Sequence, residues 1–263
     1  MMLNRKTDSD FGMIGGRAVP QPVIYSRTEE LDELRHRLGK RQPFLYYGPA
    51  GVGKTLLLSA ALANLPDILY VSRSPAPHAF YRNIAELLLS ADHPVFAKSC
   101  PSGSPSLQTK TAVSVKGLVR DALLNSKYLI VLDHLARPSR SLAAAIRELM
   151  LNWSVPAIAV SRSAHMEDVG FVLPLFADRS EKLALRNFDP ETARRFAAGC
   201  VAREGLTADN LVQFLDRIVE YSDGNPGAML RMVRLAKDPK YSHQNQIKIA
   251  PLYIDYRIAT VSQ

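Results

Sequence analysis

One segment constrains this chain more than any other: Gly48-Pro49-Ala50-Gly51-Val52-Gly53-Lys54-Thr55. It matches the pattern G-x-x-x-x-G-K-[ST] at every fixed position. The glycines permit backbone dihedrals that a side chain would block, so consecutive amide groups can curl inward around one point. An apolar run, residues 43–47, precedes the segment, and a stretch rich in Leu and Ala, residues 54–64, follows it. This order predicts a buried strand, a tight loop and a helix.

The residues of this loop suit the phosphates of a nucleotide and a magnesium ion. Inward-facing amides and the positive end of the following helix dipole both attract an anion. Lys54 adds a positive charge for the β- and γ-phosphates, and Thr55 offers its hydroxyl to Mg²⁺. We therefore expect residues 48–55 to bind ATP, with Lys54 also taking part in catalysis.

A magnesium site in such a protein also needs a carboxylate at the end of a buried strand. Asp133 directly follows the apolar run 128–132, so Thr55 and Asp133 are the predicted metal-binding pair. His134 comes next, where many ATPases of this kind carry a Glu that activates the attacking water. Two interpretations of His134 stay open: it is the catalytic base, since its pKa lies near working pH, or it orients groups in a slow ATPase.

The pattern along the chain changes near residue 189. Before it, strands and helices alternate, and the continuous apolar runs suit parallel strands covered on both faces. After it, only helices are predicted until the tail. The chain therefore divides into a flexible arm (1–24), an α/β core with a parallel sheet (25–188), a small helical lid domain (189–238) and a C-terminal tail (239–263).

Within the core and the lid, apolar periodicity predicts individual elements. The expected strands are 43–47, 68–72, 128–132, 157–160 and 182–185. The expected helices are 28–39, 54–64, 80–89, 115–123 and 142–153, with three more starting at 190, 207 and 226. Residues 92–111 are predicted to form a mobile loop, and alternation at 247, 249, 252 and 254 suggests a final strand.

Composition excludes several classes of protein. Of the residues, 47% are hydrophobic and 22% charged, which is typical of a globular domain and far from a disordered one. Cys100 and Cys200 stand apart from each other and from any close His, so neither a zinc site nor a disulfide framework is expected. We find no apolar stretch of signal-peptide or membrane-spanning length, so we expect a cytoplasmic protein without a membrane partner.

Three further segments resemble the AAA+ superfamily, in particular its origin-recognition-like and STAND branches. Tyr25–Leu31 is similar to the R-x-x-E-L box, which implies that Arg27 lies against the adenine. Ile158–Arg162 resembles the sensor 1 strand, which implies that Ser161 and Arg162 sense the γ-phosphate. Asp223–Gly227 resembles the Gly-x-Pro turn of the STAND lid, which implies that Pro226 packs near the nucleotide. The usual sensor 2 arginine is replaced by apolar residues or Gly, with Arg231 the nearest candidate.

The resemblance implies a P-loop NTPase of AAA+ type, with the magnesium and sensor strands beside the phosphate-loop strand. It implies ATP and Mg²⁺ as cofactors, a conformational switch that acts on an unidentified protein partner, and leaves open a nucleotide-dependent homo-oligomer. A DNA-associated ATPase of replication or transposition type is an alternative that the net charge of +8 permits. Six basic residues support it: Arg194, Arg195, Arg231, Arg234, Lys237 and Lys240. A small-molecule kinase and a nucleotide-binding scaffold with little turnover also remain candidates.

Overall fold

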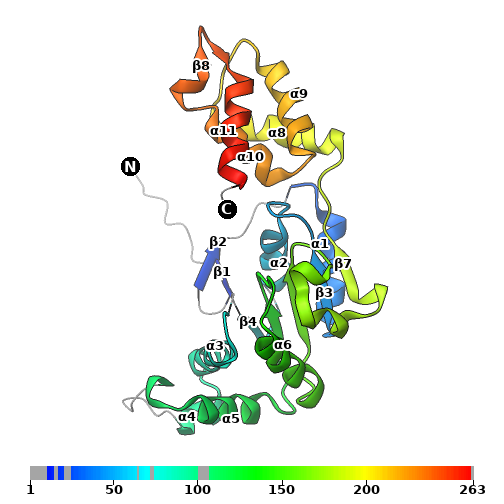
Figure 1. Cartoon of the computed structure of the whole chain (residues 1–263), viewed down its shortest axis with the longest axis vertical. Coiled ribbons are helices and arrows are strands. Elements are labelled where there is room, and N and C mark those ends of the chain that lie inside the picture. Colours follow the sequence, from blue (N-terminus) through cyan, green and yellow to red (C-terminus); the bar gives the residue numbers. More distant parts are fainter. Residues whose placement is uncertain are drawn as a thin grey trace, which may run out of the picture. The chain divides into compact units, whose positions relative to one another are not determined.

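We describe the protein from a computed structural model (Figure 1). The structure describes residues 11–14, 17–20, 25–63, 65–71, 74–99 and 107–261. The chain forms two compact units. The core unit consists of Met1–Gly48 and Lys54–Ala184, and the C-terminal unit consists of Pro49–Gly53 and Leu185–Gln263.

A five-stranded parallel sheet in the order β4-β5-β6-β3-β7 forms the centre of the core unit. Its strands are β3 (Phe44–Tyr47), β4 (Ile68–Val71), β5 (Leu129–Leu132), β6 (Ala157–Ser161) and β7 (Lys182–Ala184). The predicted strands and the parallel α/β fold are confirmed, with ends that differ by one residue. The expected strand order needs one correction: only β6 pairs with β3 on that side, and the strand that precedes Asp133, β5, lies one position further away.

The helices of the core unit follow the strands in alternation. They are α1 (Thr28–Gly39), α2 (Lys54–Leu62), α3 (Pro77–Ser90), α4 (Pro94–Ser99), α5 (Ala112–Leu123), α6 (Arg140–Arg147) and α7 (Met166–Val169). A π-helical turn, Glu148–Asn152, extends α6, and the 3₁₀ segments Gly170–Phe176 and Arg179–Glu181 lead to β7. Between α4 and α5 lies one more 3₁₀ turn, Leu107–Thr109.

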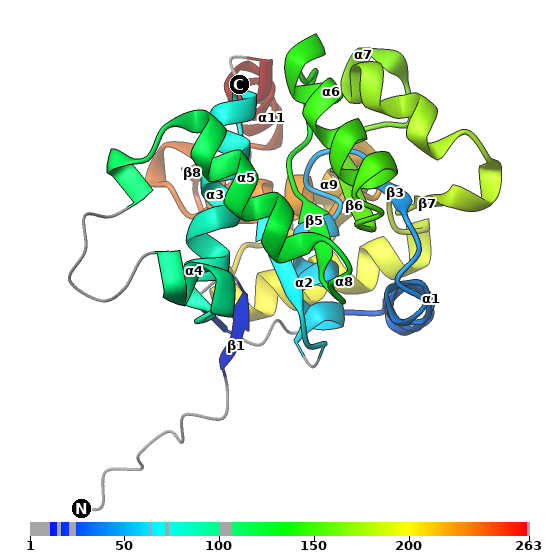
Figure 2. The same ribbon diagram turned by 90° about the horizontal axis from the view of Figure 1, so that it is seen from below.

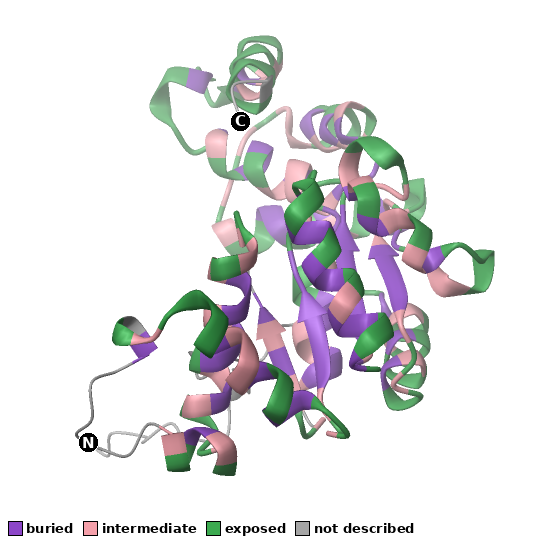
Figure 3. Cartoon of the chain, turned by 60° about the horizontal axis from the view of Figure 1, so that its bottom comes forward, coloured by how far each residue is buried: buried purple, intermediate pink, exposed green. Residues whose placement is uncertain are grey.

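The central strands β3, β5 and β6 are buried on both faces (Figure 3), whereas the edge strand β7 is partly exposed. Leu45, Ile130 and Ala159 pack into one cluster with the buried faces of α3, α5 and α6. Successive side chains of a strand point to opposite faces, so the alternate residues Tyr46 and Ile158, which are also buried, face the other side. Continuous apolar strands therefore need helices on both faces, which is why the sequence shows unbroken apolar runs.

Part of the predicted loop 92–111 is helical. Pro94–Ser99 forms α4, which lies next to α3 and α5, and Phe96 is buried in the main cluster (Figure 2). The periodicity was missed because a six-residue helix gives less than two turns of pattern. Residues 100–106 lie outside the described part of the chain.

The N-terminal arm includes a short antiparallel pair that the sequence did not predict, β1 (Phe11–Ile14) and β2 (Arg17–Pro20). The other residues of the predicted arm, 1–10, 15–16 and 21–24, lie outside the described part of the chain.

The C-terminal unit is mainly helical, with α8 (Pro190–Glu204), α9 (Leu211–Ser222), α10 (Pro226–Leu235) and α11 (Ile249–Val261). A 3₁₀ turn, Pro239–Tyr241, and a two-residue hairpin, β8 (Ser242–His243) with β9 (Gln246–Ile247), precede α11. The predicted starts of α8 and α10 are confirmed. At each start a side-chain oxygen, of Asp189 or Asn225, accepts a backbone N–H of the first turn and Pro follows as the first helical residue.

Two predictions for this unit were wrong. The helix expected from residue 207 starts at Leu211, after Asn210. Of the final strand expected around residues 247–254, only Ile247 lies in a strand, β9; from Ile249 the chain forms α11, because Leu252, Tyr253 and Tyr256 recur at helical spacing and pack in the cluster of this unit. Among the described residues, no helix has the length and apolar character needed to cross a bilayer.

The stability of the core unit should depend on the fully buried apolar residues around the sheet. Leu88 on α3 is fully buried, whereas Leu124 at the end of α5 is 47% exposed. We expect Leu88→Ala to lower the free energy of unfolding by about 2–5 kcal/mol, through lost burial and the cavity it leaves. Leu124→Ala should change it by about 0.5 kcal/mol. Urea unfolding of both variants measures the difference, and equal losses would contradict the packing described here.

Candidate functional site

The glycine loop has the curled backbone that phosphate binding requires. It joins β3 to α2, and Gly51 and Gly53 adopt positive φ angles of 79° and 103°. An added Cβ on Gly53 would meet no atom within 4 Å, so the space in front of this glycine is open. A loop with left-handed glycines, open space and a following helix N-terminus fits an anionic ligand.

Lys54 is the first residue of α2, and its side chain returns to the start of the loop. Its Nζ donates a hydrogen bond of 2.6 Å to the carbonyl oxygen of Gly48. Burial lowers the pKa of the Lys54 amine, the nearby Asp133 carboxylate opposes that shift, and the positive charge of Arg162 adds to it. Lys54 is thus a partly desolvated cation, which interacts more strongly with an added anion than a solvated one does.

Thr55 and Asp133, 78 positions apart in the sequence, meet in the core unit. The Thr55 hydroxyl donates to Oδ2 of Asp133 at 3.2 Å. The Asp133 side chain is only 1% exposed, and its Oδ1 accepts the backbone N–H of His134 at 2.8 Å. The predicted metal-binding pair is therefore in contact.

A third donor to Asp133 comes from Tyr70, which the sequence analysis did not identify. The Tyr70 hydroxyl donates to the same Oδ2 from the neighbouring strand β4. Burial and this carboxylate raise the pKa of Tyr70, so the hydroxyl remains a donor over the physiological range. No motif marks Tyr70, because its role depends on the pairing of β4 with β5.

His134 has an unusual backbone and an open side chain. Its φ of 56° lies in the left-handed region, which non-glycine residues adopt rarely and often at functional sites. Its ring is 68% exposed, and Nε2 lies 3.5 Å from Oδ2 of Asp133.

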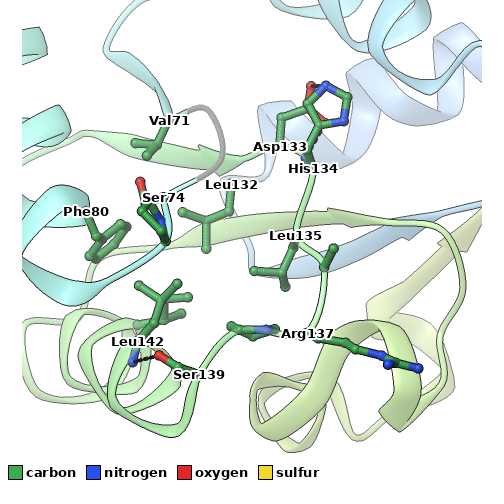
Figure 4. A pocket seen from close by; sticks show the side chains of 14 residues that line it. Val71, Ser74, Phe80, Leu132, Asp133, His134, Leu135, Arg137, Ser139 and Leu142 are labelled. Atoms are coloured by element: carbon green, nitrogen blue, oxygen red, sulfur yellow. Dashed lines mark hydrogen bonds and ion pairs between the residues drawn. The ribbon is translucent and has the colours of Figure 1, made fainter. Parts of the chain in front are cut away.

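A cavity of about 190 Å³ lies beside Asp133 and His134, at the carboxyl ends of β4 and β5 (Figure 4). Its walls are mostly apolar, with Phe80 and Leu142 among them. The Arg137 side chain points away from it, and its Nε donates to the carbonyl oxygen of Glu167 at 2.7 Å.

The two predicted sensor residues differ in burial. Ser161 ends β6 and is buried, and its hydroxyl donates to the carbonyl oxygen of Ser163 at 2.5 Å. The Ser161 carbonyl accepts the N–H of Gly48 at 3.4 Å, which links β6 to the start of the loop. Arg162 is exposed, and its charge lowers the pKa of Lys54. The strand order thus brings this segment to the loop, and the sensing role of Ser161 and Arg162 stays a prediction.

Arg27 precedes α1 and is only 7% exposed. Its Nη1 forms an ion pair with Glu30 at 2.6 Å, and its charge acts on the pKa of the buried Tyr46 hydroxyl. The expected contact of Arg27 with an adenine stays a prediction.

The other predicted loop residues, Pro49 to Gly53, are grouped with the C-terminal unit that carries Pro226. Asn225 donates from Nδ2 to the carbonyl oxygen of Ala50 at 2.9 Å, and the N–H of Gly227 donates to the carbonyl oxygen of Gly51 at 3.0 Å. The expected proximity of Pro226 to a nucleotide stays a prediction, but its two neighbours contact the loop.

Comparisons with known proteins agree with this geometry. No family model and no curated protein matches the sequence. Among solved structures, a Walker-type ATPase of Pyrococcus abyssi is similar with a TM-score of 0.59 and 15% identity, over 91% of this chain and 74% of that one. Orc1 of Aeropyrum pernix, solved in complex with DNA, is similar with a TM-score of 0.57 and 18% identity, over 90% of this chain and 66% of that one. A RuvB variant of Thermotoga maritima is similar with a TM-score of 0.51 and 12% identity, over 89% of this chain and 67% of that one. This chain therefore has the same fold as these three solved structures.

The question is therefore whether the residues of this site fit magnesium and a nucleotide. In the described residues, no group of three or more His, Cys, Asp or Glu side chains is arranged to hold a metal. One hydroxyl and one carboxylate, of Thr55 and Asp133, are the predicted donor set. Two oxygen donors fit Mg²⁺, since Mg²⁺ keeps several waters and takes further oxygens from substrate phosphates.

The three donors to Asp133 should act together. Tyr70→Phe removes one donor from a buried carboxylate, while in the Asp133→Asn background that donor has lost its charged acceptor. We expect the two substitutions to be non-additive, with a coupling of about 1–3 kcal/mol. A double-mutant cycle measured by chemical unfolding of the nucleotide-free protein gives this value. A coupling near zero would contradict the hydrogen bond between Tyr70 and Asp133.

Proposed function

We propose that this chain is an ATP-binding switch protein that hydrolyses ATP slowly and transmits the state of its nucleotide to a partner. The observation that carries the proposal is the contact of Thr55 with Asp133 at 3.2 Å, directly after a glycine loop of phosphate-binding form. Neither Thr55 nor Asp133 alone would indicate a magnesium site. Together they form the pair that P-loop ATPases need around magnesium.

Each loop residue has a separate role in this proposal. The loop amides and the N-terminus of α2 hold the β-phosphate, and Lys54 neutralises charge on the β- and γ-phosphates. Thr55 and Asp133 hold magnesium, which when bound withdraws charge from the phosphate oxygens. Arg162, exposed and acting on the pKa of Lys54, is proposed to sense the γ-phosphate together with Ser161.

The proposal of slow hydrolysis rests on the exposure of the His134 ring and on its distance from Asp133. A general base must be held within hydrogen-bond reach of the attacking water. The ring of His134 is largely exposed, and its distance of 3.5 Å from Asp133 exceeds a good hydrogen bond. A ring held this loosely orients water less well than a fixed carboxylate does, which favours a switch with a long-lived ATP state.

Two hydrogen bonds within the C-terminal unit support the proposal of a switch. The turn Pro49–Gly53 hydrogen-bonds to the start of α10 through Asn225 and Gly227. A phosphate bound by this turn therefore acts on the helical unit through direct contacts, and a change of phosphate state can alter that unit.

We propose a protein rather than DNA as the partner. Five of the six basic residues that favoured DNA lie within 4.0 Å of a carboxylate, in pairs that include Arg194 with Asp216 and Lys237 with Glu204. Carboxylates this close reduce the positive potential that would attract a phosphate backbone. A homo-oligomer that depends on nucleotide is compatible with this proposal.

Removing the charge of Lys54 tests the site. We expect Lys54→Ala to weaken the affinity for ATP and ADP by at least about 100-fold, because a partly buried cation beside the phosphates is lost. Lys127→Ala removes an exposed lysine of the same unit and should leave the affinity unchanged. Titration with a fluorescent nucleotide in the presence of Mg²⁺ measures both. Wild-type affinity in Lys54→Ala would refute the site.

Substitution of His134 tests the slow turnover. We expect wild-type turnover well below the ~10 s⁻¹ of a median enzyme. His134→Glu, which supplies the carboxylate of faster ATPases, should raise it, and His134→Ala should lower it by about 10-fold or more if the imidazole acts as base. Phosphate release under saturating ATP measures all three. If the isolated protein turns over ATP rapidly and His134→Ala leaves that rate unchanged, slow hydrolysis through His134 is refuted.

A further inference from the structure

Two carbonyl groups of the phosphate-loop turn are held by the segment that starts α10. Nδ2 of Asn225 donates to the carbonyl oxygen of Ala50 at 2.9 Å. The backbone N–H of Gly227 donates to the carbonyl oxygen of Gly51 at 3.0 Å. All four residues belong to the C-terminal unit. Two consecutive peptide groups of the turn are therefore fixed from the same side.

Fixing these carbonyls also fixes the direction of two amides. In a trans peptide the C=O and N–H groups point in opposite directions. When the carbonyls of Ala50 and Gly51 face Asn225 and Gly227, the N–H groups of Gly51 and Val52 must face away from them. The N–H of Val52 donates within the turn to the carbonyl oxygen of Pro49 at 3.4 Å. The N–H of Gly51 lies on the side toward which a phosphate-binding turn presents its amides.

The close approach requires glycine on both sides. A Cβ added to Gly227 would lie 2.8 Å from the Cα and 2.8 Å from the carbonyl oxygen of Gly51, both backbone atoms. A Cβ added to Gly51 would lie 2.8 Å from Oδ1 of Asn225. The Gly227 contact is with backbone and cannot be relieved by turning a side chain, whereas the Gly51 contact is with the side chain of Asn225, which its hydrogen bonds hold in place.

Asn225 is itself held rigidly. Its Oδ1 accepts the N–H of Ala228 at 3.1 Å and so caps α10, and its Nδ2 also donates to Oδ1 of Asn187 at 3.1 Å. The residue is 9% exposed. Both amide hydrogens and the carbonyl oxygen thus have partners, and one side chain joins the cap of α10 to the phosphate loop.

We propose that Asn225 and Gly227 are positioning residues that hold the phosphate-loop turn in its anion-binding conformation and couple a bound phosphate to the start of α10. This inference rests on the proposed nucleotide binding. It assigns the coupling to two hydrogen bonds and one glycine–glycine contact within the C-terminal unit. Because coupling between two sites is reciprocal, phosphate binding must stabilise the start of α10 as much as α10 favours the phosphate.

Asn225→Ser separates the two roles of this side chain. Serine is an equally good helix cap, so the acceptor for the N–H of Ala228 is kept. Its hydroxyl lacks the amide NH₂ that reaches Ala50, so the hydrogen bond to the loop is lost. The loss of one such bond should weaken the affinity for ADP by about 3- to 10-fold.

Gly227→Ala is the second variant, and it acts through sterics rather than through Asn225. We expect it to weaken the affinity for ADP by more than about 10-fold, because the added methyl must displace the turn. Gly199→Ala on α8 is the matched control: its added Cβ would meet no atom within 4 Å. It should bind ADP within about 2-fold of wild type. Titration with a fluorescent ADP analogue and Mg²⁺ measures all four proteins.

Hydrogen exchange of the full chain distinguishes the positioning role from a purely structural one, because only the positioning role makes the exchange rate of α10 depend on ADP. In wild type, ADP should slow exchange in the peptide that covers α10, residues 226–235, because the loop and the helix start stabilise each other. In Asn225→Ser at saturating ADP, this nucleotide-dependent slowing should be reduced, because only the bond from Gly227 remains, while exchange without nucleotide stays close to wild type. A purely structural cap would raise exchange equally with and without ADP.

The outcomes separate this inference from the proposed function. Wild-type ADP affinity in both Asn225→Ser and Gly227→Ala, with unchanged protection of residues 226–235, overturns the positioning role. If Lys54→Ala loses binding in the same titration, the proposed function stands alone. If wild type binds no nucleotide, or Lys54→Ala binds like wild type, both proposals fail.

Discussion

The hydrogen bond between Thr55 and Asp133 is the contact on which the site of the core unit depends. It joins the start of α2 to the end of β5, although β6 lies between β5 and the strand that feeds the loop. Only a parallel sheet brings these ends together, because all its strands finish at the same edge. A slip of one residue would move every side chain of a strand to the opposite face, so the packing of the helices on each face fixes the register.

The buried carboxylate explains the groups that surround it. An isolated charge with 1% exposure would be strongly destabilising, so Asp133 is surrounded by donors from three elements. Thr55 and Tyr70 donate to Oδ2, and the N–H of His134 donates to Oδ1. The left-handed φ of His134 accompanies the last of these bonds. Charge balance extends to Lys54, whose amine is partly desolvated and lies within the electrostatic reach of Asp133.

The phosphate-loop turn has a second set of constraints, separate from those on Asp133. Its carbonyls are bound by Asn225 and Gly227, so its backbone is shaped by the C-terminal unit. The flanking residues Gly48 and Lys54 belong to the core unit.

Local features were predictable from the sequence because local physics produces them. The glycine loop, the apolar strand before Asp133 and the caps at Asp189 and Asn225 are set by backbone dihedrals, side-chain period and hydrogen bonds within a few residues. Helix α11 was also encoded locally, but its helical spacing was misinterpreted as alternation.

Tertiary structure alone decided which distant residues meet. The place of β6 between β5 and β3, the hydroxyl of Tyr70 on Asp133 and the amide of Asn225 on Ala50 join segments that no pattern connects. Their pairing follows from the burial of whole strands and helices, which is a property of the assembled core rather than of any short stretch of sequence. The sequence by itself therefore determined that this protein has a glycine loop between a strand and a helix, and a carboxylate at the end of a second buried strand. Only the packing determined which side chains hold them in place.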